Sequence, residues 1–381
     1  MIRTGAGRWV LLALIGVYAM LAVGNGIDRL SLYQEVSGRL VPDFLRAHLY
    51  RQDTRIALRE ARLDAARLAA AQAVRAAPVE PGSTSVLGSA LFASAQNAPA
   101  HDAFRVAGRF GWRDIPAQVY LMLAALAFDD RKNAAERLDA IMRSAPDLEA
   151  SQAAVTALEA DARGQAALLA RLTEGPGWLP VYARTAEGLS GAAFANRIAM
   201  LQRTAAAGHR PVCAGLTDSI NRMAYEGGRF DDAYQLWQTG CATGTGIGAV
   251  NDPGFDRPAV AAPSPFDWTL PGAGGVSSTI DDGRLIARND NLVREEVARQ
   301  HLLLPPGVVD LVWEASADGS ASGLAEAVQL RCPDGSTAPT ESRTAAVGGG
   351  TEYRVQVKVS PSCRPQLLSI RIDSSVGEAR F

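Results

Sequence analysis

Apolar residues follow three different patterns along the chain. Residues 9–23 form an unbroken apolar run, residues 53–241 place apolar side chains at helical spacing, and apolar and polar residues alternate in short runs after Cys241. These patterns are typical of a membrane segment, amphipathic helices and half-buried strands, in that order. We therefore expect a multidomain protein, α then β, with an N-terminal transmembrane helix, an α-solenoid and a C-terminal antiparallel β-sandwich.

The N-terminal segment predicts a membrane anchor over residues 1–28. Residues 9–27 carry no charge, and a helix of that length spans about 30 Å, the thickness of a bilayer's hydrocarbon core. Arg3 and Arg8 precede it, so the positive-inside rule places the N-terminus in the cytoplasm and the rest outside. A cleaved signal peptide is the alternative, with Ala22-Val23-Gly24 as the cleavage site. We favour the uncleaved anchor.

Small residues recur at a step of 34 residues in the helical part. The ladder has Ala at 66, 100 and 134, a bulky residue four positions after the second and third of these, a further Ala at 107, and Pro at 78 and 146; its members are Ala66, Ala100, Phe104, Ala107, Ala134 and Leu138. Two helix pairs follow from this spacing, over residues 83–95 with 98–110 and over 115–128 with 132–144. Each pair has two apolar faces, so neighbouring pairs must stack.

The ladder is less regular on either side of this stretch. Residues 29–51 predict a helical spacer split by Pro42, residues 55–77 a helix, and residues 148–190 a degenerate repeat. The pattern returns at residues 228–237, where Ala233 precedes Trp237 by four positions. We count four to five helix pairs over residues 52–241, and expect Trp112, Trp178 and Trp237 to pack between them.

A 34-residue period with Ala at the helix contact and Pro near the close resembles the tetratricopeptide (TPR) repeat. This resemblance implies an α-solenoid that binds a protein partner.

The composition changes after Cys241. Residues 242–262 are rich in Gly, Thr, Pro and Ala and predict a linker. Its run Gly244–Ala249 is similar to a dinucleotide-binding loop, but such a loop must follow a strand, and this one follows a helix. Beyond it, runs with a period of two predict a β-sandwich over residues 263–381; they are Val308–Ala315, Ala327–Cys332, Glu352–Val359 and Gln366–Ile372.

The segment before these strands resembles the opening of jelly-roll carbohydrate-binding modules. The matching residues are Asn251–Asp256 and Ser264–Trp268. The resemblance implies first strands in both stretches and a glycan contact through Trp268 and Asp267, with core packing the favoured alternative for Trp268. Trp313 alternates in phase with Val309 and Leu311, which favours the core. Similar combinations of anchor, repeats and module accompany bacterial surface-polysaccharide production, which implies the inner membrane with the bulk in the periplasm.

The four cysteines divide into one pair for each part. Cys213 and Cys241 flank the last predicted helix pair, whose outer ends meet if the helices are antiparallel, and Cys332 and Cys363 lie at strand ends. Neither pair has the spacing of a zinc site. Two disulfides are expected, because the N-terminal segment sends the chain to an oxidising compartment.

The remaining chemistry is sparse. The net charge of −2 and the absence of charge runs argue against a nucleic-acid partner. The four histidines are isolated, and no metal or cofactor motif is found. The acidic pairs at 129–130 and 231–232 predict helix caps and that at 281–282 a turn, although paired carboxylates also occur in glycosidases.

These observations predict a non-catalytic periplasmic scaffold, not an enzyme. It would bind a protein partner through the repeats, and glycan or a second protein through the β-sandwich, in surface-polysaccharide assembly or export. One alternative is a general envelope protein-assembly factor with a purely structural β-domain. Another is an accessory part of a carbohydrate-active enzyme.

Overall fold

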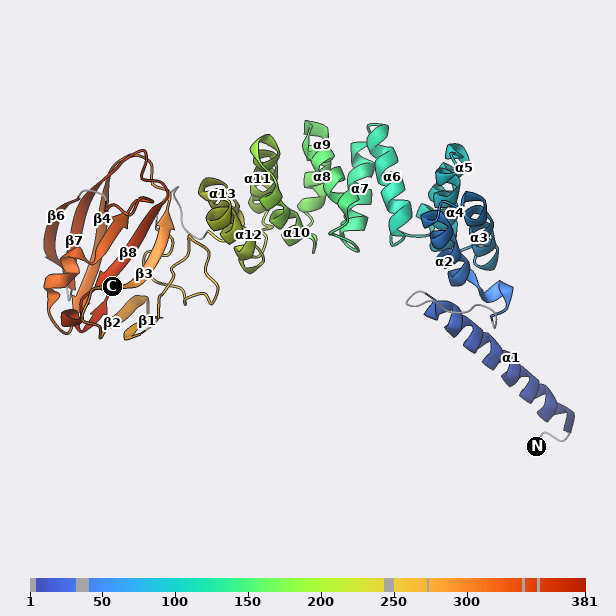
Figure 1. The fold of residues 1–381 in the computed structure, drawn as a ribbon, viewed down its shortest axis with the longest axis horizontal. Coiled ribbons are helices and arrows are strands. Elements are labelled where there is room, and N and C mark those ends of the chain that lie inside the picture. Colours follow the sequence, from blue (N-terminus) through green and yellow to red (C-terminus); the bar gives the residue numbers. More distant parts are fainter. Residues whose placement is uncertain (1–4, 32–40, 243–249, 273, 338–339, 348–349) are drawn as a thin grey trace. The chain divides into compact units, whose positions relative to one another are not determined.

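A computed structural model describes residues 5–31, 41–242, 250–272, 274–337, 340–347 and 350–381. The chain divides into two compact units, Met1–Trp178 and Leu179–Phe381, and each is described by itself. Unit 1 is helical, and unit 2 combines helices with two antiparallel sheets (Figure 1). The expected fold class, α followed by β, is therefore confirmed.

The N-terminal helix α1 spans Gly5–Leu30. Its stretch Gly7–Leu30 is long and apolar enough to cross a membrane, and only 6% of the most apolar window is buried. The polar residue near its end, Asp28, is 1% exposed. Its carboxylate accepts the backbone N–H groups of His48 and Leu49, each at 3.0 Å. Asp28 thus caps α2, whose first N–H groups would otherwise lack partners.

Four helix pairs follow in the described part of unit 1. A short 3₁₀ turn, η2 (Asp43–Leu45), precedes them. The first helices are α2 (Ala47–Arg59), α4 (Pro81–Ala93), α6 (Ile115–Ala127) and α8 (Glu149–Glu159). The second helices are α3 (Leu63–Ala76), α5 (Asn97–Phe110), α7 (Arg131–Met142) and α9 (Ala162–Leu172). The first helices start exactly one 34-residue step apart.

The turn inside each of the first three pairs is built in the same way. One residue has a left-handed backbone, with φ of 55° at Ala61, 59° at Ala95 and 60° at Asp129. The next residue donates its N–H to the carbonyl five positions earlier: Arg62 to Ala57, Gln96 to Leu91 and Asp130 to Ala125. This is the Schellman arrangement, which satisfies the carbonyls at a helix end. The same backbone hydrogen bond thus recurs every 34 residues in these three turns.

The sequence ladder marks the packing positions of this array. Its six members, together with Ala233 and Trp237 in unit 2, are all buried, at 4% exposure or less. Gly88 shows why small residues are needed, because an added Cβ would lie 3.0 Å from the ring of Phe104. A larger residue at Gly88 would therefore have to displace the ring.

Two helix boundaries differ from those expected. Residues 55–77 are not one helix, since the chain turns at Glu60–Arg62 without a Gly or Pro to signal it. The first pair also begins earlier, because α2 starts at Ala47, inside the stretch expected to be a spacer. Residues 149–172, expected to be degenerate, form the pair α8–α9, in which the turn is one residue shorter and the first helix two residues shorter than in the other pairs.

Unit 2 begins with helices. They are α10 (Leu179–Arg184), the 3₁₀ turn η3 (Thr185–Gly188), α11 (Gly191–Ala206), the 3₁₀ turn η4 (Cys213–Gly215), α12 (Thr217–Asn221), the π-helical turn η5 (Arg222–Glu226) and α13 (Phe230–Gly240). Helix α12 with η5 packs against α13 as the last pair. Gly228, with φ of 64°, makes the turn between them.

The β part of unit 2 has two antiparallel sheets (Figure 1). The larger has the order β1-β2-β9-β4-β7-β6 and the smaller β3-β8-β5. Their bounds are β1 (Val276–Asp281), β2 (Arg284–Asn289), β3 (Glu295–Leu302), β4 (Gly307–Ala317), β5 (Val328–Arg331), β6 (Thr340–Val347), β7 (Gly350–Val359), β8 (Gln366–Ile372) and β9 (Glu378–Arg380). The 3₁₀ turns η6 (Ala321–Glu326) and η7 (Ser374–Val376) complete it.

The four strands expected from alternation correspond to β4, β5, β7 and β8. Residues 251–256 and 264–268, where the jelly-roll resemblance implies first strands, instead form turns and bends. One isolated bridge, Thr269 to Arg299, joins this segment to β3. The Gly244–Ala249 run, expected to be linker, lies outside the described residues.

Candidate functional site

The segment that leads into the sheets packs on the last helix pair. Phe266 is 1% exposed, and its ring centroid lies 5.0 Å from that of Tyr234 and 5.7 Å from that of Trp237, both on α13. A second contact is made by β3, where His301 lies 5.2 Å from Phe230. The helices and sheets of unit 2 therefore share one apolar junction.

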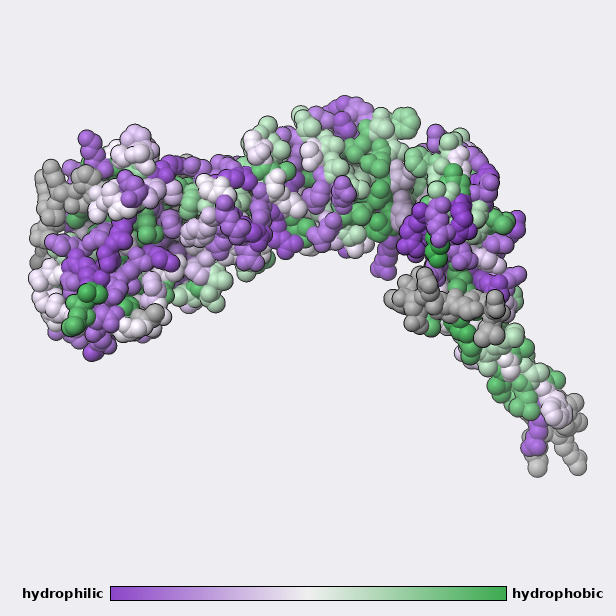
Figure 2. All heavy atoms as spheres, viewed as in Figure 1, coloured by the Kyte–Doolittle hydropathy of each residue, from purple (hydrophilic) through white to green (hydrophobic). Residues whose placement is uncertain are grey.

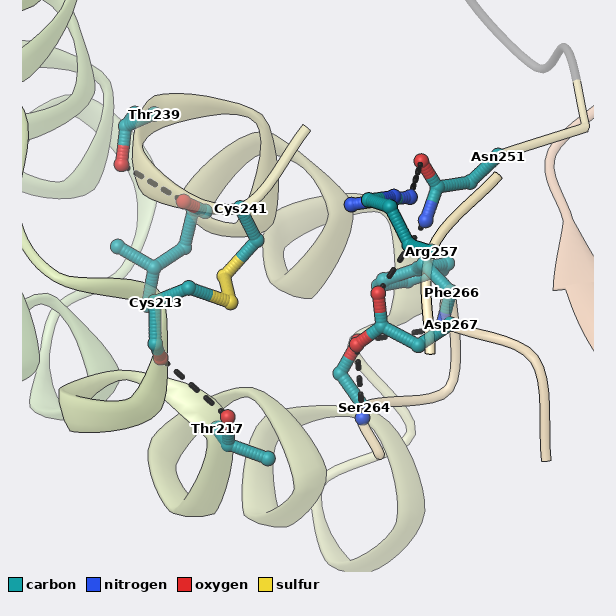
Figure 3. Close-up of a disulfide and its surroundings, with 10 residues drawn as sticks. Cys213, Thr217, Thr239, Cys241, Asn251, Arg257, Ser264, Phe266 and Asp267 are labelled. Atoms are coloured by element: carbon teal, nitrogen blue, oxygen red, sulfur yellow. Dashed lines mark hydrogen bonds between the residues drawn. A yellow bond between two sulfur atoms is a disulfide. The ribbon is translucent and has the colours of Figure 1, made fainter. Parts of the chain in front are cut away.

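The carboxylate of Asp267 organises the polar side of this junction (Figure 3). It accepts hydrogen bonds from the Ser264 backbone N–H at 3.0 Å, the Ser264 hydroxyl at 2.6 Å and the Asn251 side-chain amide at 3.2 Å. Gln300 on β3 holds the backbone of Asn251 from both sides, accepting its N–H at 2.8 Å and donating to its carbonyl at 3.0 Å. A buried polar group is stable when it is paired in this way.

The two residues expected to contact glycan lie inside this arrangement. Trp268 is 7% exposed, packs 5.0 Å from the ring of Phe255 and donates its indole N–H to the Asp252 carbonyl. Asp267 is 9% exposed. Trp268 therefore offers no free ring face on which a sugar could stack, and the Asp267 carboxylate already accepts three hydrogen bonds within the protein. Their burial favours the core alternative for Trp268.

Both expected disulfides are present. Cys213–Cys241 joins η4 to the end of α13, and Cys332–Cys363 joins the end of β5 to the turn before β8. Figure 3 shows the first bridge in the same view as the Asp267 network. Disulfides persist in oxidising compartments. With the apolar N-terminal helix, which acts as an anchor or a signal, they indicate an extracytoplasmic location.

The titratable candidates have structural surroundings. Burial and the nearby Arg299 lower the pKa of His301 to about 4. Asp130 caps α7, and the hydrogen bonds that it accepts from Asn133 lower the pKa of its carboxyl. Asp231 lies within α13 rather than in a turn, and pairs with Arg364. No group of three or more His, Cys, Asp or Glu in the described residues could hold a metal ion.

The surface of the helical array in unit 1 has a different character. Helices α4 and α6 contain no charged residue at all. Pro116, Tyr120, Leu123 and Ala127, at helical spacing on α6, are exposed or partly exposed, with Leu123 at 49%. Figure 2 shows apolar residues gathered over the position that α6 has in Figure 1. A water-facing helix normally carries polar residues on its outer face, so this stripe is a candidate binding surface.

Equivalent positions of the repeats show how polarity is lost toward α6. In the first repeat, Arg51 pairs with Glu80 at 2.8 Å. One step later, Ser85 donates to Asp114 at 3.0 Å. A further step places Val119 and Leu148 there. An ion pair is thus replaced by a hydrogen bond and then by two apolar residues.

An open hollow of about 480 Å³ lies on the array near α7 and α9. Its charged residues largely neutralise one another, because Asp129 pairs with both Arg131 and Arg163, and Arg131 also pairs with Asp161. No triad or carboxylate pair for catalysis is formed by these ion-paired side chains.

No protein-family model matches the sequence, and a search of curated proteins finds no match. The sites are therefore interpreted from their own geometry. The buried ladder was predicted from sequence periodicity, whereas the exposed stripe on α6 was not. The sequence signal that could have indicated the stripe is the complete lack of charge in residues 115–127.

Proposed function

We propose that this chain is a non-catalytic scaffold of the cell envelope that binds a protein partner through its helical array. The observation that carries the proposal is the apolar stripe on α6, which is exposed although it belongs to a regular, well-packed pair. Apolar stripes of this kind form contacts with the apolar side of a partner segment. The array in this proposal is a TPR-like solenoid.

The proposed location is the bacterial inner membrane. Helix α1 would be a single-pass anchor with a cytoplasmic N-terminus, and the rest of the chain would lie in the periplasm. Support comes from the basic residues that precede the apolar stretch. The capping of α2 by Asp28 supports an anchor joined directly to the first repeat.

Surface-polysaccharide assembly or export is the proposed process, and it rests on the jelly-roll resemblance. A second function, a general assembly factor for envelope proteins with a structural β-domain, has one observation in its favour. Trp268 and Asp267, the proposed glycan contacts, are 7% and 9% exposed. Binding of the full chain to an array of acidic and neutral glycans separates the two, because the assembly factor would bind none of them.

The scaffold function is tested by crosslinking in intact cells, with a crosslinker that does not cross the inner membrane. We expect extracytoplasmic proteins to be captured by the full chain and lost with Leu123→Asp, which places a charge in the stripe. Phe128→Asp is the matched control, because Phe128 is 82% exposed in the turn after α6. Capture of cytoplasmic proteins alone would refute both the topology and the function.

A further inference from the structure

The second repeat of the array carries exposed aromatic residues at two positions where the flanking repeats have none. Trp112 occupies the ladder position at which the first and third repeats have Pro78 and Pro146. Trp112 is 50% exposed, and Phe110 is 44% exposed. The expectation that Trp112 packs between repeats is therefore met only in part, because its ring lies against Arg137 of α7 in the next repeat while half of the side chain is exposed. At the position of Phe110, the flanking repeats have only Ala76 and Ser144.

These aromatic residues are not needed to build the repeat, since the flanking pairs fold with smaller residues at the same positions. Val106, at 38% exposure, lies one helical turn before Phe110 on the outer face of α5. Large exposed aromatic residues are common at the energetic centre of protein interfaces.

Three arginines accompany them, none with a carboxylate partner among the residues that the structure describes. Arg137 lies over the Trp112 ring at 4.2 Å and donates to the Gln118 side-chain oxygen at 2.9 Å. Burial lowers the pKa of Arg137, against a smaller opposite effect of Glu136. Arg109 and Arg113 are exposed and form no ion pair within the described part of the chain. We call this set the Trp112 patch; it consists of Val106, Arg109, Phe110, Trp112, Arg113 and Arg137.

The arginines of the patch differ from several others nearby on the array surface, which have acidic partners. On the same face of α5, Arg105 pairs with Asp102, and the arginines in the hollow at α7 and α9 also have acidic partners. In the Trp112 patch, Arg137 lies over the Trp112 ring, and the exposed Arg109 and Arg113 are sequence neighbours of Phe110 and Trp112. Guanidinium groups pair strongly with carboxylates, often through two parallel hydrogen bonds.

We infer that the Trp112 patch binds an acidic protein segment that also carries apolar or aromatic side chains. The inference rests on the proposed scaffold function and names a surface and a partner chemistry for it. The exposed aliphatic Val106 favours a protein over an acidic glycan, because apolar side chains of a protein segment can cover it, whereas a glycan presents mainly hydroxyl and charged groups.

The test uses the full chain in lipid nanodiscs and a display library of random 12-residue peptides. We expect enriched peptides to contain Asp or Glu together with Leu, Phe or Trp. For one synthetic enriched peptide, fluorescence anisotropy should show affinity weakened about tenfold or more by Arg109→Glu and by Trp112→Ser. Arg75→Glu, at the equivalent position one repeat earlier, and Phe128→Ser should leave the affinity unchanged.

Several results would overturn the inference. One is enrichment of peptides without acidic residues, or of peptides that bind Arg109→Glu as tightly as the parent. Another is binding of oligogalacturonate, an acidic oligosaccharide, that is lost with Arg109→Glu, in the absence of any peptide whose binding is lost with the same change. That result would assign the patch to glycan. Peptides sensitive to Leu123→Asp but not to Arg109→Glu would contradict the patch and leave the scaffold function standing. No peptide binding at all would contradict both.

Discussion

The helical array of unit 1 and the β part of unit 2 use their aromatic residues in opposite ways. On the array, Trp112 and Phe110 are 50% and 44% exposed. In unit 2, Phe266 and Trp268 are 1% and 7% exposed and hold the connecting segment in place. Side chains suited to binding thus lie free on the array, whereas those in the region expected to contact glycan are engaged in packing. The comparison directs the search for a partner to the array.

The two regions also differ in how they are held together. The described part of unit 1 contains no disulfide and repeats the same turn in its first three pairs at a 34-residue step. Unit 2 contains both disulfides and the polar network around Asp267. A repeat array is stabilised mainly by contacts between neighbours. Unit 2 depends instead on a few contacts between residues distant in sequence, and changes there should have larger effects.

The largest effect is expected from Phe266→Ala. Removing a buried phenylalanine side chain costs about 4 kcal/mol of unfolding free energy, because it loses apolar burial and leaves a cavity. The exposed counterpart Trp112→Ser should change stability by less than about 0.5 kcal/mol. Urea unfolding followed by circular dichroism measures both. Equal losses of unfolding free energy in the two variants would contradict the distinction between structural and exposed aromatic residues.

A slightly smaller loss is expected when the Cys213–Cys241 bridge is removed. The bridge closes a loop with a sequence separation of 28 residues, and such a crosslink contributes about 3 kcal/mol. Cys213→Ser with Cys241→Ser should lower the melting temperature of unit 2 and leave that of unit 1 in place. Calorimetry with and without reductant provides the check. A shift of unit 1 alone would contradict the assignment.

Acid should destabilise unit 2 through His301. Its folded pKa of about 4 lies below the ordinary value of 6.5, so the unfolded chain binds the proton more tightly. The stabilisation from the neutral ring is complete above pH 6.5 and is lost as the pH falls toward 4, by about 2.5 kcal/mol at pH 4.5. The unfolding free energies of the parent and of His301→Gln, measured as a function of pH, should converge as the pH falls from 6.5 to 4. Curves that stay parallel over this range would rule the effect out.

The smallest effect is a gain in stability within the array. Ala61 and Ala95 have the left-handed φ that glycine adopts without strain, so Ala61→Gly and Ala95→Gly should each stabilise unit 1 by up to about 1 kcal/mol. Ala153→Gly, at an exposed position inside α8, should destabilise it by a similar amount. Thermal unfolding tests the opposite signs, and a loss with all three would show that the turns are not as described.

Much of the array could be predicted because its period is carried by small buried residues. Ala66, Ala100 and Ala134 report directly on helix contacts. The turn at Ala61 could not be found, since the residue with positive φ is alanine, and only the hydrogen bonds around it reveal the helix end.

The β part was predicted where strands alternate clearly and missed where they do not. β4 and β7 present apolar residues at every second position, whereas β1 reads Val-Ser-Ser-Thr-Ile-Asp and gives little signal. Phe266 lies in a segment without periodicity, so its packing against α13 could not be predicted and is known only from the contacts in the structure. The Trp112 patch was equally hidden, because exposure and unpaired charge are properties of the folded surface.

The central claim is that partner binding belongs to the array rather than to the sheets. Site-specific photocrosslinking in living cells tests it directly, with the photoreactive residue placed at Leu123, at Trp112 or, for comparison, at Thr279, an exposed position on β1. The account predicts adducts with an extracytoplasmic protein from the two array positions and none from Thr279. Adducts from Thr279 alone would contradict it.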